Sequence, residues 1–541
     1  MKRNFLAGIL ASVMGLSLLA GCGSGGKNTG ASAETPAPTA TAAAPATAAP
    51  QKTPAPLPEE DSPKTERALA NEITIGIAQD FDSLDPHHMT AAGTKEVMFN
   101  VYEGLVKPSS DGELIPAVAS EVSKSEDGLT YTFTLRPDVK FHNGDPVTMD
   151  DVVYSIERRR NGEDAEAKLA ALDIISSLTP DADGRTLTVT LSEPSNEFLA
   201  YVMNAYIIPA EYSLLETAPV GTGPYKFVSR AAQDNLVLER FADYWGTPGK
   251  LDKVTYKILE NSEGLVLGLQ SGALDLVAHL AADQTRQLSI ADFDIAQGSM
   301  NLVQALYLNN AEKPFDDVRV RQALCYAIDK QMVIDLAFDG YGIPLGTSMF
   351  PSFGKYYDQS LTDYYSYDPA AAKALLAEAG YPDGFDMTIT VPSNYAPHVN
   401  TAEVLVELLR EVGINVTVLP VDWSTWLSDV YGARQFQSTI TGLTSDNMTA
   451  RKLLERFGSD AGNNFTNYSN EEYDRILSEA ITETDDAEQT AMYRLLERNL
   501  TENAANVYLQ DMADLVAVRH GLTGLDFYPL YVLDVSTLYW A

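Results

Sequence analysis

The chain is predicted to be an α/β protein, because strand patterns and helix patterns alternate along most of its length. Thr130–Leu135 and Thr186–Leu191 both alternate threonine with larger apolar or aromatic residues, as half-buried strands do. Pro369–Ala379 is an alanine- and leucine-rich helix pattern that stops before Gly380. The 541 residues, 45% of them hydrophobic, suffice for roughly two to four globular domains.

Residues 1–21 have the pattern of a secretory signal. Two basic residues precede an apolar run over residues 5–20, which is too short to span a bilayer comfortably. Leu-Ala-Gly directly precedes Cys22, and this resembles the lipobox of bacterial lipoproteins, in which the cysteine is diacylated and becomes the mature N-terminus. Two acyl chains anchor a protein stably. We therefore expect export and lipidation at Cys22, with a plain secretory signal as the alternative.

Residues 22–70 form an alanine-, threonine- and proline-rich segment with almost nothing to bury. Such a composition is typical of disordered chain, and its prolines favour extended conformations. We expect a linker that holds the folded body away from the membrane. Order is predicted to begin near Asn71, where Ile73, Ile75 and Ile77 alternate with other residues as in a strand.

The chain is strongly acidic. Its 38 Lys and Arg residues and 75 Asp and Glu residues give a formal net charge of −37 at pH 7. Such a surface repels nucleic acid, which is therefore not expected as a partner. The sequence has only two cysteines. With Cys22 lipidated, Cys325 has no intramolecular partner, and we interpret it as a small buried hydrophobic residue.

Catalytic and metal-binding signatures are missing from the sequence. It contains no HExxH, G-x-S-x-G, P-loop or CxxC motif. Of six histidines, only His87 and His88 are neighbours, and adjacent side chains on extended chain point to opposite faces. They are therefore not expected to bind one metal ion. The prediction is a protein that is not an enzyme and that uses neither a metal nor a cofactor.

One long helix pattern lies in the second half of the chain. Val318–Leu336 carries apolar residues at helical spacing, and Asp317 precedes it as a capping carboxylate. Arg319 and Arg321 lie off the apolar stripe. We interpret them as surface or inter-element ion pairs, with a solvated helix face as the alternative.

Seven ordered segments give the most specific information on function. They are Phe81–Pro86, Asn100–Leu105, Thr130–Gly144, Pro146–Tyr154, Gly221–Phe227, Leu308–Leu324 and Tyr367–Gly384. In this order they resemble the solute-binding protein family 5 of bacterial ABC importers, which comprises dipeptide and oligopeptide receptors. The resemblance covers about residues 72–541.

The resemblance implies a periplasmic-binding-protein type II fold with two lobes, a hinge and an extra domain. Domain I would comprise residues 72–105, 219–308 and 500–541, domain II residues 106–218, and domain III residues 309–499. The solute would lie between domains I and III, and closure about crossing strands would bury it. The permease of an ABC importer would then recognise the closed form, and the receptor is expected to be a monomer.

In peptide-binding members of this family, an aspartate holds the amino terminus of the ligand. The matching stretch here is Ile440–Asn447, which makes Asp446 and Asn447 candidate ligand-binding residues. A buried ammonium group needs an anionic, hydrogen-bonded partner, so the chemistry fits. Capping of a helix that starts near Thr449 is the alternative role of Asp446. The acidic, proline-containing run that often follows in the family is replaced here by Met-Thr-Ala-Arg-Lys.

Four further candidates for ligand binding follow predicted strands. Trp423 and Trp426 occupy a region where the family places cleft-lining residues, and aromatic rings suit the walls of a binding site. Their three-residue spacing equally fits the core face of a helix, so both interpretations stay open. Asn394 and Tyr395 follow another predicted strand and are weaker cleft candidates.

The leading hypothesis is a lipid-anchored receptor on the extracytoplasmic face of the cell membrane. It would capture dipeptides or oligopeptides and pass them to an ABC permease. A receptor of the same class for a sugar, an opine or chelated nickel is the alternative, because the acidic run after Asp446 is missing. A third hypothesis, from a different class, is an extracytoplasmic hydrolase.

Overall fold

The computed structural model describes residues 66–162, 168–445 and 447–541. Cys22, Asp446 and the predicted signal lie outside the described residues, as does most of the predicted linker. Among the residues that are described, no helix combines the length and the apolar composition needed to cross a bilayer.

The described chain begins before the first predicted strand. A short helix, α1 (Glu66–Leu69), is held by an ion pair of 2.5 Å between Arg67 and Asp275. Asp275 also accepts a hydrogen bond from the backbone N–H of Thr74 at 2.9 Å. This ion pair fixes α1 to the sheet, so the folded body starts earlier than Asn71.

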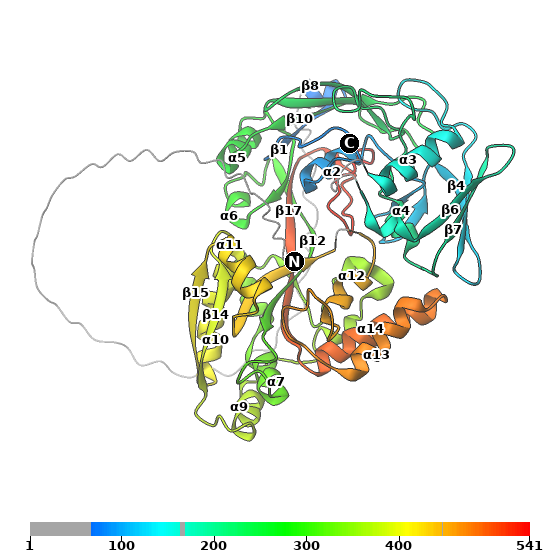
Figure 1. The fold of residues 1–541 in the computed structure, drawn as a ribbon. Helices are drawn as coiled ribbons and strands as arrows, with labels where there is room; N and C mark the ends of the chain where they lie inside the picture. The colour runs from blue at the N-terminus through cyan, green and yellow to red at the C-terminus, as the bar shows by residue number, and fades with distance from the viewer. Residues whose placement is uncertain (1–65, 163–167, 446) are drawn as a thin grey trace, which may run out of the picture. The chain divides into compact units, whose positions relative to one another are not determined.

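An eleven-stranded sheet runs through the molecule, and ten of its strands follow the order β15-β14-β16-β12-β17-β11-β1-β10-β9-β8. β13 pairs with β17 off this path. The bounds are β1 Glu72–Ile77, β8 Tyr225–Ala231, β9 Asn235–Arg240, β10 Lys253–Ile258, β11 Leu276–Leu280, β12 Phe293–Leu308, β13 Gly342–Pro344, β14 Phe385–Pro392, β15 Ile414–Val421, β16 Ser438–Thr444 and β17 Asn506–Arg519. The two longest strands, β12 and β17, pass through the middle of the molecule (Figure 1).

The upper half of the sheet, in the view of Figure 1, consists of β1 and β8–β11. β1 runs parallel to β10 and β11, with Ile73 and Ile75 buried. The strand predicted after Asn71 is therefore confirmed. The helices of this half are α2 (Ala92–Met98), α5 (Ser262–Gln270) and α6 (Ala282–Thr285).

A separate four-stranded antiparallel sheet has the order β4-β5-β7-β6. Its strands are β4 Ala119–Lys124, β5 Thr130–Leu135, β6 Ile175–Pro180 and β7 Thr186–Leu191. β5 and β7 have the bounds that their alternation predicts. The core of this sheet is closed by α3 (Met149–Asn161) and α4 (Phe198–Val202), and the Phe198 ring centroid lies 5.0 Å from that of Tyr131. A short hairpin of β2 (Val106–Pro108) and β3 (Leu114–Pro116) precedes it.

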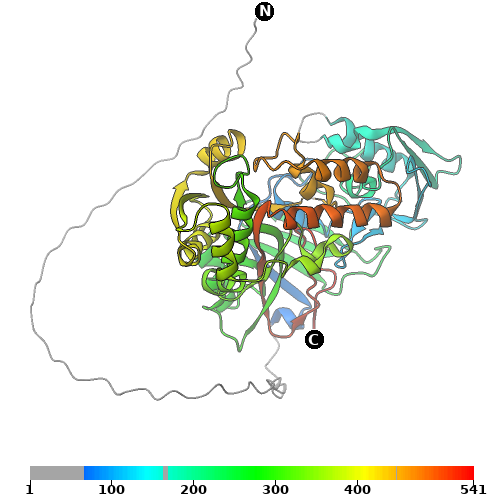
Figure 2. The ribbon, with the colours of Figure 1, turned by 90° about the horizontal axis from the view of Figure 1, so that it is seen from below.

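The lower half of the large sheet consists of β14, β15 and β16, with helices packed around them (Figure 1). These are α7 Val318–Ala327, α8 Lys330–Phe338, α9 Pro369–Glu378, α10 Ala396–Glu411, α11 Trp423–Thr425, α12 Arg451–Leu454, α13 Glu471–Thr482 and α14 Asp486–Glu502, with a π-helical segment, η4, over Trp426–Gly432. α13 and α14 pack side by side, which the view from below shows most clearly (Figure 2). α9 confirms the predicted helix before Gly380.

The helix predicted over Val318–Leu336 is two helices, α7 and α8. Ile328 leaves the helical conformation, with φ −109° and ψ 115°, and the Asp329 side chain accepts a hydrogen bond from the backbone N–H of Met332 at 3.1 Å. The first backbone N–H groups of a helix have no partner within that helix, and a capping aspartate accepts hydrogen bonds from them. In a continuous helix the preceding turn would accept these bonds instead. Because apolar residues continue at helical spacing on both sides, the pattern does not reveal the break.

Arg321 corrects the interpretation of the two arginines on α7. Its guanidinium is buried and donates to the carbonyl oxygens of Ala504 at 3.0 Å, Phe315 at 2.8 Å and Asn503 at 2.9 Å. The prediction of an ion pair or a solvated face is therefore wrong for Arg321. Arg319 is exposed and does form an ion pair, at 2.6 Å, with Asp317.

Cys325 lies on the same helix and is buried, as predicted. Burial raises the pKa of its thiol to about 12, so the side chain is a neutral thiol at ordinary pH. It therefore behaves as a small apolar residue of the core.

We expect Arg321→Ala to lower the free energy of unfolding by about 3 kcal/mol, because it leaves buried carbonyl groups without their charged donor. Arg319→Ala is the matched control and should cost no more than about 1 kcal/mol, as exposed ion pairs do. Urea unfolding of both variants checks this through the transition midpoint at unchanged slope. Equal losses for the two variants would contradict the assignment of Arg321 to a structural role.

Candidate functional site

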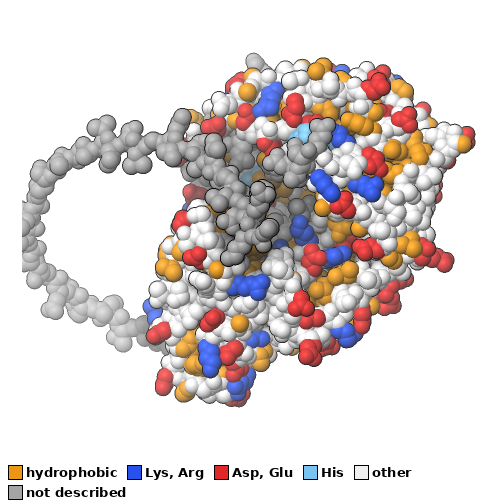
Figure 3. All heavy atoms as spheres, in the orientation of Figure 1, with side chains coloured by type: hydrophobic (Ala, Val, Ile, Leu, Met, Phe, Trp, Pro, Cys, Tyr) orange, Lys and Arg blue, Asp and Glu red, His pale blue; other side chains and the backbone are white. Residues whose placement is uncertain are grey.

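A cavity of about 410 Å³ lies at the centre of the molecule. We call it the central cavity. Its walls come from α2 and the residues after it, the middle of β12, the end of β16 and the C-terminal loop; they include Lys95, Tyr102, Asn301, Leu302, Thr444 and Ser445. Both halves of the large sheet therefore contribute to one concave surface. On the face shown in Figure 3, acidic and basic side chains are interspersed over the coloured surface.

A second pocket, of about 310 Å³, continues from the central cavity. We call it the basic pocket. Lys95, Asn204 and Tyr206 line both spaces, so the two form one continuous cleft. Asn447 and Lys452 complete it from the side of the lower half.

The segment predicted to hold the ligand, Ile440–Asn447, reaches this cleft. Thr444 and Ser445 line the central cavity, and Asn447 lines the basic pocket. The Ser445 hydroxyl donates to the backbone oxygen of Asn447 at 2.8 Å. Asp446, the main candidate, lies outside the described residues, so its role stays a prediction.

The aromatic candidates lie elsewhere. Trp426 is only 3% exposed, belongs to the core of the lower half, and donates its indole N–H to the Thr439 hydroxyl at 2.9 Å. Trp423 is 37% exposed and stacks on Trp426 with ring centroids 5.0 Å apart. Asn394 and Tyr395 are exposed, and Tyr395 meets the Trp423 ring edge-on. None of these four residues lines the central cavity or the basic pocket, so a ligand-binding role for them stays a prediction.

The pairing of β12 with β17 is interrupted beside the cavity. Ser299 pairs with Ala513 and Val303 with Asp511, so residues 300–302 have no partner on β17. Asn301 adopts a positive φ of 56° within this break. The break places Leu302 in the cavity wall and, through its pairing with β16, places Thr444 beside it.

The side chain of Asp511 fills the interrupted ladder. It is fully buried and accepts hydrogen bonds from the backbone N–H of Leu302 at 3.0 Å and from the Ser299 hydroxyl. Burial raises the pKa of this carboxyl to about 7, although its hydrogen bonds favour the charged form. The two long strands are therefore joined by a titratable side chain at the point where their backbones are not paired.

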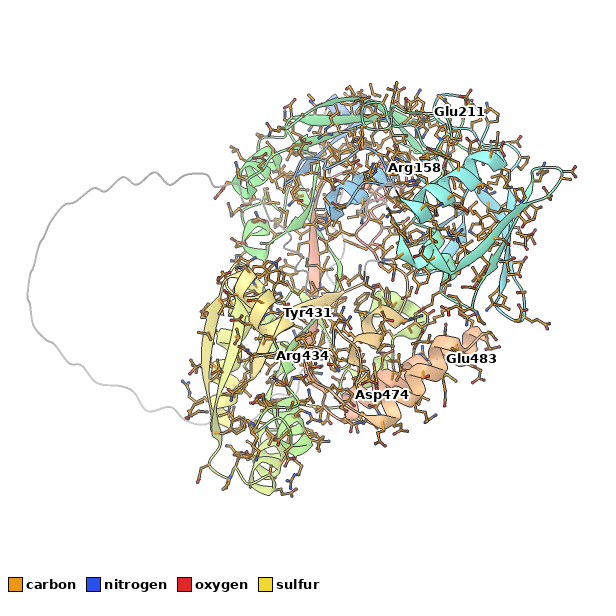
Figure 4. The ribbon with its side chains drawn as sticks, viewed as in Figure 1. Arg158, Glu211, Tyr431, Arg434, Asp474 and Glu483 are labelled. Atoms are coloured by element: carbon orange, nitrogen blue, oxygen red, sulfur yellow. The ribbon has the colours of Figure 1, made fainter. Side chains whose placement is uncertain are left out.

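A further contact joins the lower half to the four-stranded sheet. Tyr493 of α14 donates its hydroxyl to the buried carboxylate of Glu197 at 3.1 Å, and a guanidinium nitrogen of Arg451 lies 3.7 Å from the same group. Nearby, the Asn196 amide donates to the backbone oxygen of Glu483 at 2.9 Å. Figure 4 labels Glu483 at the end of α13 that extends toward the four-stranded sheet.

One group of described residues has the composition of a metal site. Asp85, His88 and Glu216 bring ligand atoms within 4.8 Å of one another. Arg158, labelled in Figure 4, places guanidinium nitrogens 2.8 and 2.6 Å from the two oxygens of Asp85. This fixed positive charge opposes a second cation at the same carboxylate, so the group does not suit a metal ion.

Residues 113–465 match the sequence model of the bacterial extracellular solute-binding proteins, family 5 Middle. The chain belongs to this family. Its resemblance to the family and its predicted type II periplasmic-binding-protein fold are thereby confirmed. The match spans the four-stranded sheet and most of the lower half, including the segment over residues 440–447.

Individual proteins agree with this membership. The chain is 31% identical to the glutathione-binding protein GsiB of Pectobacterium atrosepticum over 85% of this chain and 92% of that protein. The fold matches the murein tripeptide binding protein MppA in its unliganded open form, with a TM-score of 0.78 at 23% identity over 87% of this chain and 97% of the other. It also matches the periplasmic binding protein DppA of Helicobacter pylori in complex with the peptide STSA, with a TM-score of 0.66 at 26% identity over 87% and 98%.

The basic pocket of this family 5 protein is the part of the site that the sequence patterns did not predict. Its cationic residues come from three separate segments, represented by Lys95, Arg159 and Lys452. One signal was available, because Arg451 and Lys452 stand in the run that replaces the family's acidic continuation. That difference indicates a change of charge at the end of the cleft.

The raised pKa of Asp511 predicts a pH dependence of stability. Between about pH 4 and pH 7 the folded protein keeps a proton that an unfolded aspartate, with a pKa of 3.8, has lost. The stabilisation from this group is fully present below about pH 4 and is lost as the pH rises through about 7. We expect the melting temperature of the protein, minus that of Asp511→Asn, to fall across this range. The exposed Asp526→Asn is the control, and a difference that is constant with pH would contradict the prediction.

Proposed function

We propose that this protein is a lipid-anchored extracytoplasmic receptor that captures peptides and delivers them to the permease of an ABC importer. The observation that carries the proposal is the continuous cleft lined by both halves of the large sheet. Among the strands that the structure describes, these halves are connected within the sheet only through β12 and β17. A cleft beside two interrupted crossing strands suits binding that is coupled to closure.

According to the domain division inferred from the sequence, the walls of this cleft would come from two different lobes. With residues 309–499 as domain III, Thr444, Ser445 and Asn447 belong to one lobe, while Lys95 and Tyr102 belong to the other. A solute that contacts both sets of residues stabilises the closed arrangement over the open one. A ligand that contacted one lobe alone would shift no equilibrium between them.

Peptides are the solute class that the cleft and the comparisons support best. Glutathione, which the curated relative binds according to its name, is a tripeptide, and the solved DppA relative carries a bound peptide. In this chain, Thr444 and Ser445 continue a strand into the cavity, where backbone groups of an extended peptide could pair with strand ends. Sugars, opines and chelated nickel are outcomes that the binding test distinguishes.

The first test is a search for the solute by thermal shift. Peptides, glutathione, sugars, opines and nickel chelates are added separately, and a true solute raises the melting temperature according to RT ln(1 + [L]/Kd). X-ray scattering of the same protein should then show a smaller radius of gyration with the bound solute. A tight binder that leaves the scattering curve unchanged would reject closure, and consumption of the solute would favour the hydrolase.

Once a peptide that binds has been identified, Asp446→Asn tests whether Asp446 is the partner of the peptide's amino terminus. We expect the binding free energy to weaken by about 2–5 kcal/mol, because the ammonium group loses its anionic partner. Asp460→Asn, an exposed site on the same half, is the control and should change binding by less than about 0.5 kcal/mol. Equal affinities of the two variants would assign Asp446 to helix capping instead.

The membrane anchor is tested at Cys22. We expect the natural protein to sediment with membranes and Cys22→Ser to be recovered in the soluble fraction, since the thiol that carries the lipid is removed. Membrane association that persists in this variant would reject lipidation at Cys22.

A further inference from the structure

One asparagine in the wall of the central cavity is hydrogen-bonded to three other segments of the chain. Asn301, in the break of the β12–β17 ladder, lines the cavity. Its backbone oxygen accepts a hydrogen bond from the Thr444 hydroxyl at 2.8 Å, and its side-chain oxygen accepts one from the hydroxyl of Ser352 on the 3-10 helical segment η2 (Pro351–Tyr356). Its side-chain N–H donates to the backbone oxygen of Tyr528 at 2.9 Å. By the domain division inferred from the sequence, Thr444 and Ser352 belong to one lobe and Tyr528 to the other.

Ser299 connects this asparagine to Asp511, the titratable side chain in the break. The Ser299 hydroxyl oxygen lies 3.1 Å from the side-chain oxygen of Asn301 and within hydrogen-bond distance of a carboxyl oxygen of Asp511. It also accepts a hydrogen bond from the backbone N–H of Asn301 at 3.1 Å. A hydroxyl has a single proton, so Ser299 can donate to only one of these two side-chain oxygens at a time.

The charge of Asp511 decides which oxygen receives that proton. An ionised carboxylate only accepts, so it takes the Ser299 proton and leaves the side-chain oxygens of Ser299 and Asn301 facing each other without a proton between them. A neutral carboxyl group instead donates its own proton to Ser299, whose hydroxyl then donates to Asn301. Its other oxygen still accepts the hydrogen bond from the backbone N–H of Leu302 at 3.0 Å. The neutral acid therefore satisfies all of these contacts together.

Asp511 is also the group of this cluster that titrates near neutral pH. β12 and β13 place apolar residues opposite it. From the segment after η2, Tyr357 is a titratable neighbour, and the carboxyl groups of Asp511, Asp358 and Glu497 all raise the pKa of its phenol, which stays neutral around pH 7. Burial raises the pKa of Asp511 itself to about 7. The hydrogen bonds of Ser299 therefore follow the protonation of Asp511.

A solute in the central cavity would lie against the residues that this cluster positions. Met300, Asn301 and Leu302 all line the cavity. A solute packed on them would hold this segment in the conformation that the neutral acid satisfies, and it would remove water from beside the carboxyl group. Both effects favour the protonated form of Asp511. Because such coupling is reciprocal, the protonated form then binds the solute more tightly.

We propose that Asp511, Ser299 and Asn301 form a proton-linked switch that couples solute binding in the central cavity to the protonation of Asp511. Binding takes up a proton from the solvent at this carboxyl group, and the receptor holds its solute more tightly at acidic than at alkaline pH. Asp511 acts as a positioning residue, through Ser299 and Asn301. The inference rests on the proposed function and adds a regulation of the same site.

The sign of the effect follows from the two states. Below about pH 7 the free folded protein already carries the proton, so its affinity is at its maximum there. As the pH rises through about 7, the free protein loses the proton and binding has to restore it, so the affinity falls. The loss continues until the pH also exceeds the pKa of Asp511 in the complex.

Calorimetry with Ala-Ala-Ala and with glutathione tests the switch on the natural protein. We expect the dissociation constant of a probe that binds to be at least about threefold larger at about pH 8 than at about pH 5.5. Titrations in two buffers with different ionisation enthalpies measure the protons exchanged on binding. Binding at about pH 7.5 should take up a sizeable fraction of one proton.

The variant Asp511→Asn assigns the proton to this residue. Its amide N–H can donate to Ser299 as the neutral acid does, but it does not titrate. We expect this variant to lose both the proton uptake and the pH dependence. The exposed Asp526→Asn is the control with the same change of charge and should keep both. Since the probes titrate identically with every variant, the difference between proteins isolates Asp511.

The variant Ser299→Ala tests the path of the coupling. It leaves Asp511 able to titrate but removes the hydroxyl that connects it to Asn301, so the ratio of the two dissociation constants should fall toward one. This measurement and the proton uptake of the natural protein keep the proposal falsifiable if Asp511→Asn folds poorly.

Different failures separate this inference from the function on which it rests. If a probe binds equally well at both pH values and without proton uptake, the receptor function stands and the switch is rejected. If the pH dependence survives in Asp511→Asn or in Ser299→Ala, the switch is rejected in this form. If neither probe binds at either pH, peptide capture itself is rejected, and the inference with it.

Discussion

The pairing of β12 with β17 is the constraint on which the rest of the structure depends. Within the large sheet, β16 joins β12 and β11 joins β17, so in the described part of the chain the two halves are continuous only through this pair. The pair is interrupted at residues 300–302, where Asp511 substitutes side-chain hydrogen bonds for the ladder. The central cavity opens beside the same residues. The walls of the cleft and the least regular part of the connection therefore coincide. A molecule bound in the cavity would touch the strands that join the two halves.

The net charge of −37 does not decide what the cleft attracts. At physiological ionic strength the Debye length is about 8 Å, so carboxylates scattered over a large surface are screened from a solute inside the cleft. Cations that line the pocket act at contact distance, where the screening is weak. The acidic exterior instead keeps the protein from nucleic acid and anionic lipid surfaces.

Sequence patterns predicted the parts of the fold that one segment specifies by itself. The alternation in β5 and β7 and the stripe in α9 each report the burial of one face, which is a local property. The break between α7 and α8 was missed because Asp329 caps a helix without disturbing the apolar spacing. Arg321 was misjudged because its partners are backbone oxygens from a distant part of the chain. The segment Ile440–Asn447 was located by its motif, whereas Lys95 and Lys452 are far apart in sequence and line one pocket only in the folded chain.

Glu197 ties the lower half to the four-stranded sheet. Tyr493 and Arg451 reach this carboxylate from the lower half, and Asn196 beside it bonds to the backbone at Glu483. The lower half is thus attached at two separated places, the crossing strands and this cluster. A body attached at two points has one easy rotation left, about the line that joins them, whereas a single attachment would also permit twisting and lateral swing. The cluster would accordingly restrict the motion of the lower half to rotation about one axis. Each closure would then bring the same side chains into the same alignment.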